Sequence, residues 1–123
     1  LSNVVGADDV DSFNFLPSLL RDARTGHIAL RTDLASVKDY IHIDDVLLLL
    51  PRIALQGRQS MYNVASGQQV THKQWVDRLV AMTGCTVQVL AKSPLARFAP
   101  VDVSRIRAEF GFAPRPVLST LTL

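Results

Sequence analysis

Apolar positions with helical spacing mark the first helix, which the sequence predicts over residues 13–25. Ser12 or Asp11 is available as its N-cap, and Gly26 follows its last turn. The predicted apolar face consists of Phe13, Leu16, Leu19, Leu20 and Ala23. A short strand over residues 27–31 is expected to follow.

The stretch KDYIHIDDVLLLL, residues 38–50, predicts a strand that leads directly into a helix. Alternation places Ile41 on one face of the strand and Tyr40 on the other. The apolar run that follows is typical of a buried helix, and Asp44 is its predicted N-cap. Pro51 is expected to kink or shorten this helix, because proline removes a backbone donor.

The clearest helix is predicted over residues 71–84, where Thr71 and Gln74 form a capping box before an apolar face that includes Val80 and Met82. Another helix is expected over residues 102–111, with Asp102 as N-cap and Gly111 as its stop. Strands are predicted over residues 60–67 and 85–91, and an incomplete helix over 118–123. These elements predict a single α+β (mixed α/β) domain over residues 1–123, with a small sheet and packed helices.

Composition restricts the class of protein. Of the 123 residues, 48% are hydrophobic and 20% charged, which is enough apolar sequence for a core. No run is long enough to span a membrane and no signal peptide is recognisable, so we expect a cytoplasmic protein. The single Cys85 fits a reducing compartment and a place in the core. Because the chain opens with Leu1 inside an apolar stretch, we expect it to be part of a longer protein.

Charge is distributed unevenly along the chain. Residues 1–45 carry eight acids and four bases, whereas residues 46–123 carry three acids and nine bases. The second part could attract an anion. The bases do not cluster and no aromatics interleave with them, so nucleic-acid binding is not expected.

No segment carries a recognisable catalytic motif. His42 and Asp44 could hold a metal or move a proton, but further imidazoles occur only on other segments, and a histidine satisfied at a strand end is the better interpretation. The six glycines lie at least ten residues apart, which excludes a dinucleotide fingerprint and a P-loop within the chain. Neither Tyr40 nor Tyr62 begins a Tyr-x-x-x-Lys pair.

Four motifs in order resemble the C-terminal half of an extended short-chain dehydrogenase/reductase, the NAD-dependent epimerase/dehydratase family that acts on nucleotide sugars. They are SNVVG, KDYIHIDDV, MYNVASGQQVTHKQWVDRLVAMTG and VDVSRIRAEFGFAPRP, at residues 2–6, 38–46, 61–84 and 101–116. In addition, FLPSLLRDARTGH, residues 15–27, resembles the helix that follows the first motif in the family. The resemblance implies a Rossmann domain upstream, which would carry the glycine-rich loop and the Tyr-x-x-x-Lys pair. The present chain would then be the part that binds substrate.

The resemblance also implies site residues. Asn3 and Lys38 occupy positions that contact the substrate diphosphate, and Ser2 occupies one near the nicotinamide. Lys38 replaces the family's arginine, so it keeps the charge without the bidentate fork. The nucleobase would contact Leu16, Pro17 and Leu30, and Arg97 is the positional counterpart of a second phosphate-binding arginine.

Each of these residues has a structural alternative. Asn3 could satisfy backbone groups in a loop, Lys38 could be a solvated charge at a strand end, and Arg97 could be a surface residue. The apolar residues assigned to the nucleobase would be core residues in any interpretation.

The sequence hypothesis is therefore the substrate-binding lobe of an NAD-dependent nucleoside-diphosphate-sugar epimerase, dehydratase or reductase, with a role in polysaccharide biosynthesis. The alternative is a non-catalytic binding or assembly module of the same fold. NAD or NADP would be bound mainly by the upstream Rossmann domain, and no cofactor is expected to bind these 123 residues alone. The reaction, the base, the sugar and a homodimeric state are left open.

Overall fold

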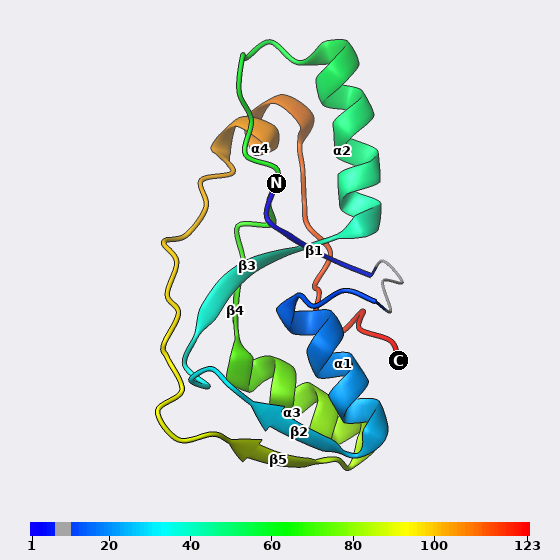
Figure 1. Cartoon of the computed structure of the whole chain (residues 1–123). Coiled ribbons are helices and arrows are strands. Elements are labelled where there is room, and N and C mark those ends of the chain that lie inside the picture. The colour runs from blue at the N-terminus through cyan, green and yellow to red at the C-terminus, as the bar shows by residue number, and fades with distance from the viewer. Residues whose placement is uncertain (7–10) are drawn as a thin grey trace. The chain divides into compact units, whose positions relative to one another are not determined.

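The structure is a computed structural model that describes residues 1–6 and 11–123 (Figure 1). Its described helices and strands confirm the mixed α/β class, with four helices and two small sheets. In chain order they are β1 (Asn3–Val5), α1 (Phe15–Thr25), β2 (His27–Leu30), β3 (Val37–His42), α2 (Ile43–Gln56), β4 (Gln69–Thr71), α3 (His72–Thr83), β5 (Thr86–Val89) and α4 (Ser104–Phe110).

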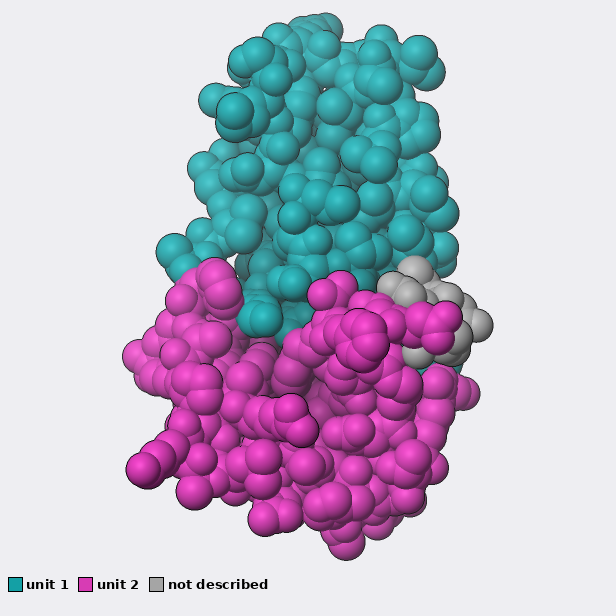
Figure 2. Space-filling model, viewed as in Figure 1, with its two compact units in different colours: residues 1–7, 38–69, 99–122 teal, residues 8–37, 70–98, 123 magenta. Residues whose placement is uncertain are grey.

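Two compact units make up the chain (Figure 2). Unit 1 comprises residues 1–7, 38–69 and 99–122, and unit 2 comprises residues 8–37, 70–98 and 123. That residues 1–123 form one domain stays a prediction.

Unit 1 is built around β1 and β3, which pair in parallel with Asn3 opposite Tyr40 and Val5 opposite His42. They belong to a sheet with the strand order β1-β3-β4. Tyr40 and Ile41 point to opposite faces of β3 and both are buried. A strand buried on both faces is typical of a parallel sheet. The core cluster of this unit contains Ile41, Val46, Leu49, Val64, Ala65, Val103, Ile106 and Phe110.

The prediction of a strand over residues 60–67 is wrong. This segment has no regular structure, although Val64 and Ala65 are buried in the core. Val64 O accepts a hydrogen bond from Ser2 N at 2.9 Å, which holds the segment beside the start of β1. The strand β1 itself, only three residues long, was not predicted.

The cap of α2 differs from the prediction. His42, not Asp44, is the N-cap, because its Nδ1 accepts from Asp44 N at 3.1 Å. The helix therefore begins at Ile43, and Asp44 lies in its first turn, where a carboxylate favours the positive end of the helix dipole. The helix continues past Pro51 to Gln56, so the proline does not end it.

We predict that His42→Ala lowers the free energy of unfolding by about 1 kcal/mol, because one backbone donor loses its cap. Asp44→Ala should cost less, about 0.5 kcal/mol, since only the interaction with the helix dipole is lost. His42→Asn is the matched control, because asparagine is a good N-cap. Urea unfolding measures the free energy of unfolding of the three variants, which should fall most for His42→Ala. A larger loss for Asp44→Ala than for His42→Ala would restore Asp44 as the cap.

Unit 2 contains α1, α3 and the parallel pair β2–β5, in which His27 lies opposite Thr86 and Leu30 opposite Val89. The helix α1 packs against β2 and α3, and it ends at Gly26, whose φ of +96° suits glycine. Its N-cap is Asn14, neither Ser12 nor Asp11. The buried residues of this unit include Leu16, Leu19, Ala23, Ile28, Leu30, Trp75, Val76, Leu79 and Cys85.

The apolar pattern places Phe13 on the buried face of the first helix. It is 94% exposed, since it precedes the helix instead of lying within it. On α3, Val80 and Met82, which the sequence places on the apolar face, are each 37% exposed, because the buried face of the helix is narrower than the apolar pattern.

The predicted capping box of α3 is confirmed, with Gln74 N donating to Thr71 Oγ1 at 3.1 Å and Thr71 N donating to Gln74 Oε1 at 2.8 Å. In α4 the N-cap is Val103 instead of the predicted Asp102, whose Oδ1 accepts from Ser104 N at 2.9 Å.

The prediction of a helix over residues 118–123 is wrong, since only a turn forms there. None of the helices in the described ranges is long and apolar enough to cross a membrane.

Candidate functional site

In unit 1 the structure brings Asn3 and Lys38 onto neighbouring strands. Asn3 lies opposite Tyr40, and Lys38 precedes Tyr40 by two residues on β3. Side chains two residues apart share a face of a strand, so the Lys38 and Asn3 side chains lie on the same face of this pair. Asn3 is exposed and donates from Nδ2 to Asp39 O at 2.9 Å.

Ser2, the residue predicted near the nicotinamide, precedes β1 and is half-buried. Its Oγ is buried and has no hydrogen-bond partner within residues 1–6 and 11–123. The backbone of Ser2 is held by the hydrogen bond to Val64.

A buried carboxylate fixes the strand that carries Lys38. Asp39 is 5% exposed. Its Oδ1 accepts from Ser66 N at 3.0 Å and from Ser66 Oγ at 3.3 Å, and its Oδ2 accepts from Gly67 N at 2.8 Å. Gly67 has φ +75°, and a Cβ there would lie 2.9 Å from Val103 Cγ2. Asp39 therefore ties β3 to the turn at Ser66 and Gly67, a role that no local sequence pattern predicts.

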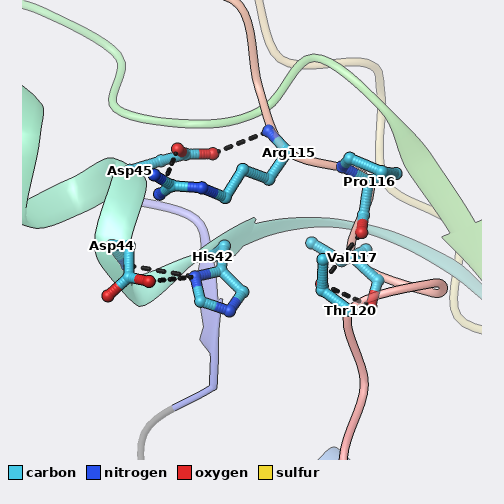
Figure 3. A network of polar contacts seen from close by, with 7 residues as sticks. All are labelled: His42, Asp44, Asp45, Arg115, Pro116, Val117 and Thr120. Carbon is cyan, nitrogen blue, oxygen red and sulfur yellow. Dashed lines mark hydrogen bonds and ion pairs between the residues drawn. The ribbon is translucent and has the colours of Figure 1, made fainter.

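A second buried carboxylate, Asp45, anchors the start of α2 to the C-terminal segment (Figure 3). Its Oδ2 accepts from Arg115 N at 2.8 Å, and its Oδ1 accepts from Arg115 Nη1 at 2.8 Å. Thr120 Oγ1 donates to Pro116 O at 2.9 Å and so folds the chain back just after this anchor. Asp45 thus has a structural role.

The opening of α2 has a structural explanation as a whole. His42 Nδ1 lies 3.6 Å from Asp44 Oδ2 and accepts from the backbone, so the imidazole caps the helix. Over the described ranges, no group of three or more His, Cys, Asp or Glu side chains could hold a metal ion. These observations favour the interpretation of His42 as a histidine satisfied at a strand end.

Unit 2 holds the other predicted residues. Leu16 is 6% exposed and Leu30 is 3% exposed, so both contribute mainly to the core. Pro17 lies half-buried in the first turn of α1. Arg97 is exposed, and its backbone forms a parallel bridge with Val37.

His72 is another buried polar residue of unit 2, at 1% exposure. Its Nδ1 shares a 2.7 Å hydrogen bond with Thr32 Oγ1, and its ring stacks on Phe15 with the centroids 3.8 Å apart. Its backbone N also donates to Ser36 O at 2.8 Å. These contacts give His72 a role in packing.

A hollow of about 250 Å³ lies in unit 1 beside α4. Its lining consists of Met61, Asn63, Asp102, Ser104 and Arg105. Hydrogen bonds from the backbone and the side chain of Ser104 lower the pKa of Asp102, and the nearby Arg105 adds to the effect. None of the residues predicted to bind substrate lines this hollow.

Comparison with known proteins gives matches among solved structures. No protein-family model and no curated protein sequence matches the chain. A dTDP-glucose 4,6-dehydratase from Bacillus anthracis, solved with NAD, is 21% identical with a TM-score of 0.76, over 94% of this chain and 38% of that one. An NAD-dependent NDP-hexosamine 5,6-dehydratase of tunicamycin biosynthesis is 21% identical with a TM-score of 0.79, over 95% of this chain and 40% of that one.

A third match is the UDP-glucose 4-epimerase of Thermotoga maritima, solved with UDP-glucose. It is 22% identical with a TM-score of 0.74, over 95% of this chain and 40% of that one. The chain thus spans about two fifths of the length of these enzymes. At these identities the match establishes the fold: the chain folds like part of an NAD-dependent nucleotide-sugar dehydratase or epimerase.

Proposed function

We propose that the chain is the substrate-binding part of an NAD-dependent enzyme that epimerises, dehydrates or reduces a nucleoside-diphosphate sugar. The observation that carries this proposal is the position of Asn3 and Lys38 on one face of adjoining parallel strands. Its fold is shared with enzymes of this kind, one of which was solved with UDP-glucose. The alternative is a non-catalytic binding module, which would bind the sugar nucleotide without converting it.

The chemistry of the two side chains suits a diphosphate. An amide group has two N–H donors, and Asn3 uses one for Asp39 O. The second can donate to a phosphate oxygen. The Lys38 ammonium supplies a positive charge, and a charge-assisted hydrogen bond is stronger than a neutral one. Asp39, held by three hydrogen bonds, fixes the backbone from which Lys38 extends.

The cofactor of the proposed enzyme is NAD or NADP, which supplies the hydride chemistry when bound. Ser2 is the residue of this chain that we assign to it, and the buried Oγ without a partner in the described ranges fits a polar group supplied from outside. A glycine-rich phosphate loop would come from the part of the enzyme outside these residues. The roles of Leu16, Pro17, Leu30 and Arg97 stay predictions.

Lys38→Ala tests the proposal in the full-length protein. Loss of one charge-assisted contact, worth about 1.5–3 kcal/mol, should weaken the affinity for the nucleoside-diphosphate sugar about ten- to a hundredfold. Lys38→Arg should be tolerated or bind more tightly, because a guanidinium can engage two phosphate oxygens. NAD content should not change.

The matched control is Lys73→Ala, which removes a lysine of the exposed Lys73–Asp77 pair on α3. Calorimetry with UDP-glucose and dTDP-glucose measures the affinities. If Lys38→Ala binds every nucleoside-diphosphate sugar tested as tightly as the parent, Lys38 is a solvated charge at a strand end. Binding without turnover would favour the non-catalytic module.

A further inference from the structure

The segment that carries Arg97 contains no helix and no strand beyond a single bridge, yet its backbone is fixed. Pro94 O accepts from Asp33 N at 2.9 Å, and Ala96 O accepts from Val37 N at 3.0 Å. Arg97 itself forms the parallel bridge with Val37. These contacts hold the segment against another irregular stretch of unit 2, more than fifty residues earlier in the chain.

Ser36 is the residue that joins these two segments. It is 0% exposed, and its backbone and hydroxyl groups are all hydrogen-bonded. The Oγ accepts from Ala96 N at 3.0 Å, the backbone N donates to Asp33 O at 3.0 Å, and the backbone O accepts from His72 N at 2.8 Å. Because a buried donor is costly to leave unpaired, the Ser36 hydroxyl determines where the backbone just before Arg97 lies.

The turn over residues 33–36 rests on the start of α3. Leu34 O accepts from Lys73 N at 2.9 Å, next to the bond from His72 N. The first N–H groups of a helix have no partner within the helix, so the carbonyls of the turn satisfy two of them. The turn, and the segment hydrogen-bonded to it, are therefore attached to a regular helix of unit 2.

The Arg97 side chain is exposed, and it forms no ion pair within residues 1–6 and 11–123. A solvated surface arginine gains nothing from a fixed backbone. An arginine that binds a ligand does gain affinity, since less conformational freedom is lost on binding. The planar guanidinium also matches the geometry of a phosphate group.

We propose that Ser36 is a positioning residue for sugar-nucleotide binding, whose buried hydroxyl holds the backbone at Ala96 so that the Arg97 guanidinium is presented to a phosphate group. This inference rests on the proposed function. Ser36 does not touch the ligand and acts through Arg97, so its effect on affinity requires the arginine.

A double-mutant cycle in the full-length protein tests this role, with affinities for UDP-glucose and dTDP-glucose measured by calorimetry. Arg97→Ala should weaken binding about ten- to a hundredfold, because one charge-assisted contact is lost. Ser36→Ala should weaken it about three- to tenfold, since the guanidinium must then be ordered on binding. In the Arg97→Ala background, Ser36→Ala should change the affinity less than about twofold. Ser36→Cys, which keeps a weak acceptor, should fall between Ser36→Ala and the parent.

Two variants in unit 2 serve as matched controls. Thr83→Ala removes a hydroxyl that also accepts from a backbone donor, Cys85 N at 3.2 Å, and Arg24→Ala removes an exposed arginine of α1. Both should bind within about twofold of the parent. The urea midpoint is a separate readout: Ser36→Ala should lower it equally with and without Arg97, because the buried hydrogen bond does not involve the guanidinium.

Unchanged affinity of Ser36→Ala overturns the proposal, and so does unchanged affinity of Arg97→Ala. An equal loss of affinity on Ser36→Ala in both Arg97 backgrounds also overturns it, since Ser36 would then be a purely structural residue. Lys38→Ala separates this inference from the proposed function. If Lys38→Ala weakens binding and Ser36→Ala does not, the positioning role alone is wrong. If the parent binds neither nucleotide, the proposed function fails as well.

Discussion

Asp39→Ala is expected to lower the free energy of unfolding by about 2–6 kcal/mol, because two backbone donors lose their partner at about 1–3 kcal/mol each. These donors are Ser66 N and Gly67 N, and Ser66 is itself 1% exposed, so water cannot readily replace the carboxylate there. The turn requires glycine at position 67, where φ is +75° and a Cβ would lie 2.9 Å from Val103 Cγ2. Chemical denaturation followed by circular dichroism measures the loss.

Two further variants test this prediction, one at Asp39 itself and one at an exposed control position. Asp39→Asn keeps one acceptor oxygen but turns an N–H₂ group toward a backbone donor, so it should lose roughly half of the effect. Asp33→Ala is the matched control, since Asp33 is more exposed and accepts one local bond from Ala35 N at 2.8 Å. Its cost should be about 0.5–1.5 kcal/mol. A loss for Asp39→Ala no larger than that of Asp33→Ala would contradict the role assigned to the buried carboxylate.

Arg115→Ala is the second large effect, a loss of about 2–3 kcal/mol, because a buried carboxylate is left without its cation. Asp45 is 3% exposed, and among residues 1–6 and 11–123 only the backbone N of Arg115 would remain to satisfy it. The loss is placed below the range of about 3–5 kcal/mol for fully buried pairs because the Arg115 side chain is 41% exposed. Thermal unfolding of the variant measures it.

A double-mutant cycle measures the coupling energy between Asp45 and Arg115. Asp45→Ala combined with Arg115→Ala should cost less than the two single changes added together, since the second change removes a group that already lacks its partner. Arg107→Ala, which replaces an exposed arginine of α4, should stay within about 0.5 kcal/mol of the parent. Additive losses for Asp45 and Arg115 would show that the ion pair contributes no coupling energy.

Elements with strong local signals could be predicted from the sequence. The order of the helices and of the strands β2, β3 and β5 followed from apolar periodicity, and the ends of α1, α3 and α4 followed from Gly26, Gly84 and Gly111. All three of these glycines adopt the left-handed conformation expected at a helix C-terminus.

The misplaced elements depend on contacts that are distant in sequence. The segment 60–67 has a strand-like composition, but Asp39, 27 residues before Ser66, holds its end in a turn. Asp45 and Arg115 are 70 residues apart. The sequence does not predict the cap by His42, because an imidazole nitrogen is a less common acceptor at this position than a carboxylate or a hydroxyl.

The residues of the candidate site could be predicted only from the family resemblance. Asn3 and Lys38 are 35 positions apart, and their common face depends on the parallel pairing of β1 with β3. No local pattern encodes that pairing, and β1 itself is too short for a periodic signal.

Amide chemical-shift mapping of the isotope-labelled full-length protein, titrated with UDP-glucose and with dTDP-glucose, tests the central claim most directly. The proposed function predicts that one of the two sugars shifts the signals of Ser2, Asn3 and Lys38, while those of α4 stay in place. If neither nucleotide shifts Asn3 or Lys38, or if the shifts fall on the hollow beside α4, the assignment of this chain to sugar-nucleotide binding is wrong.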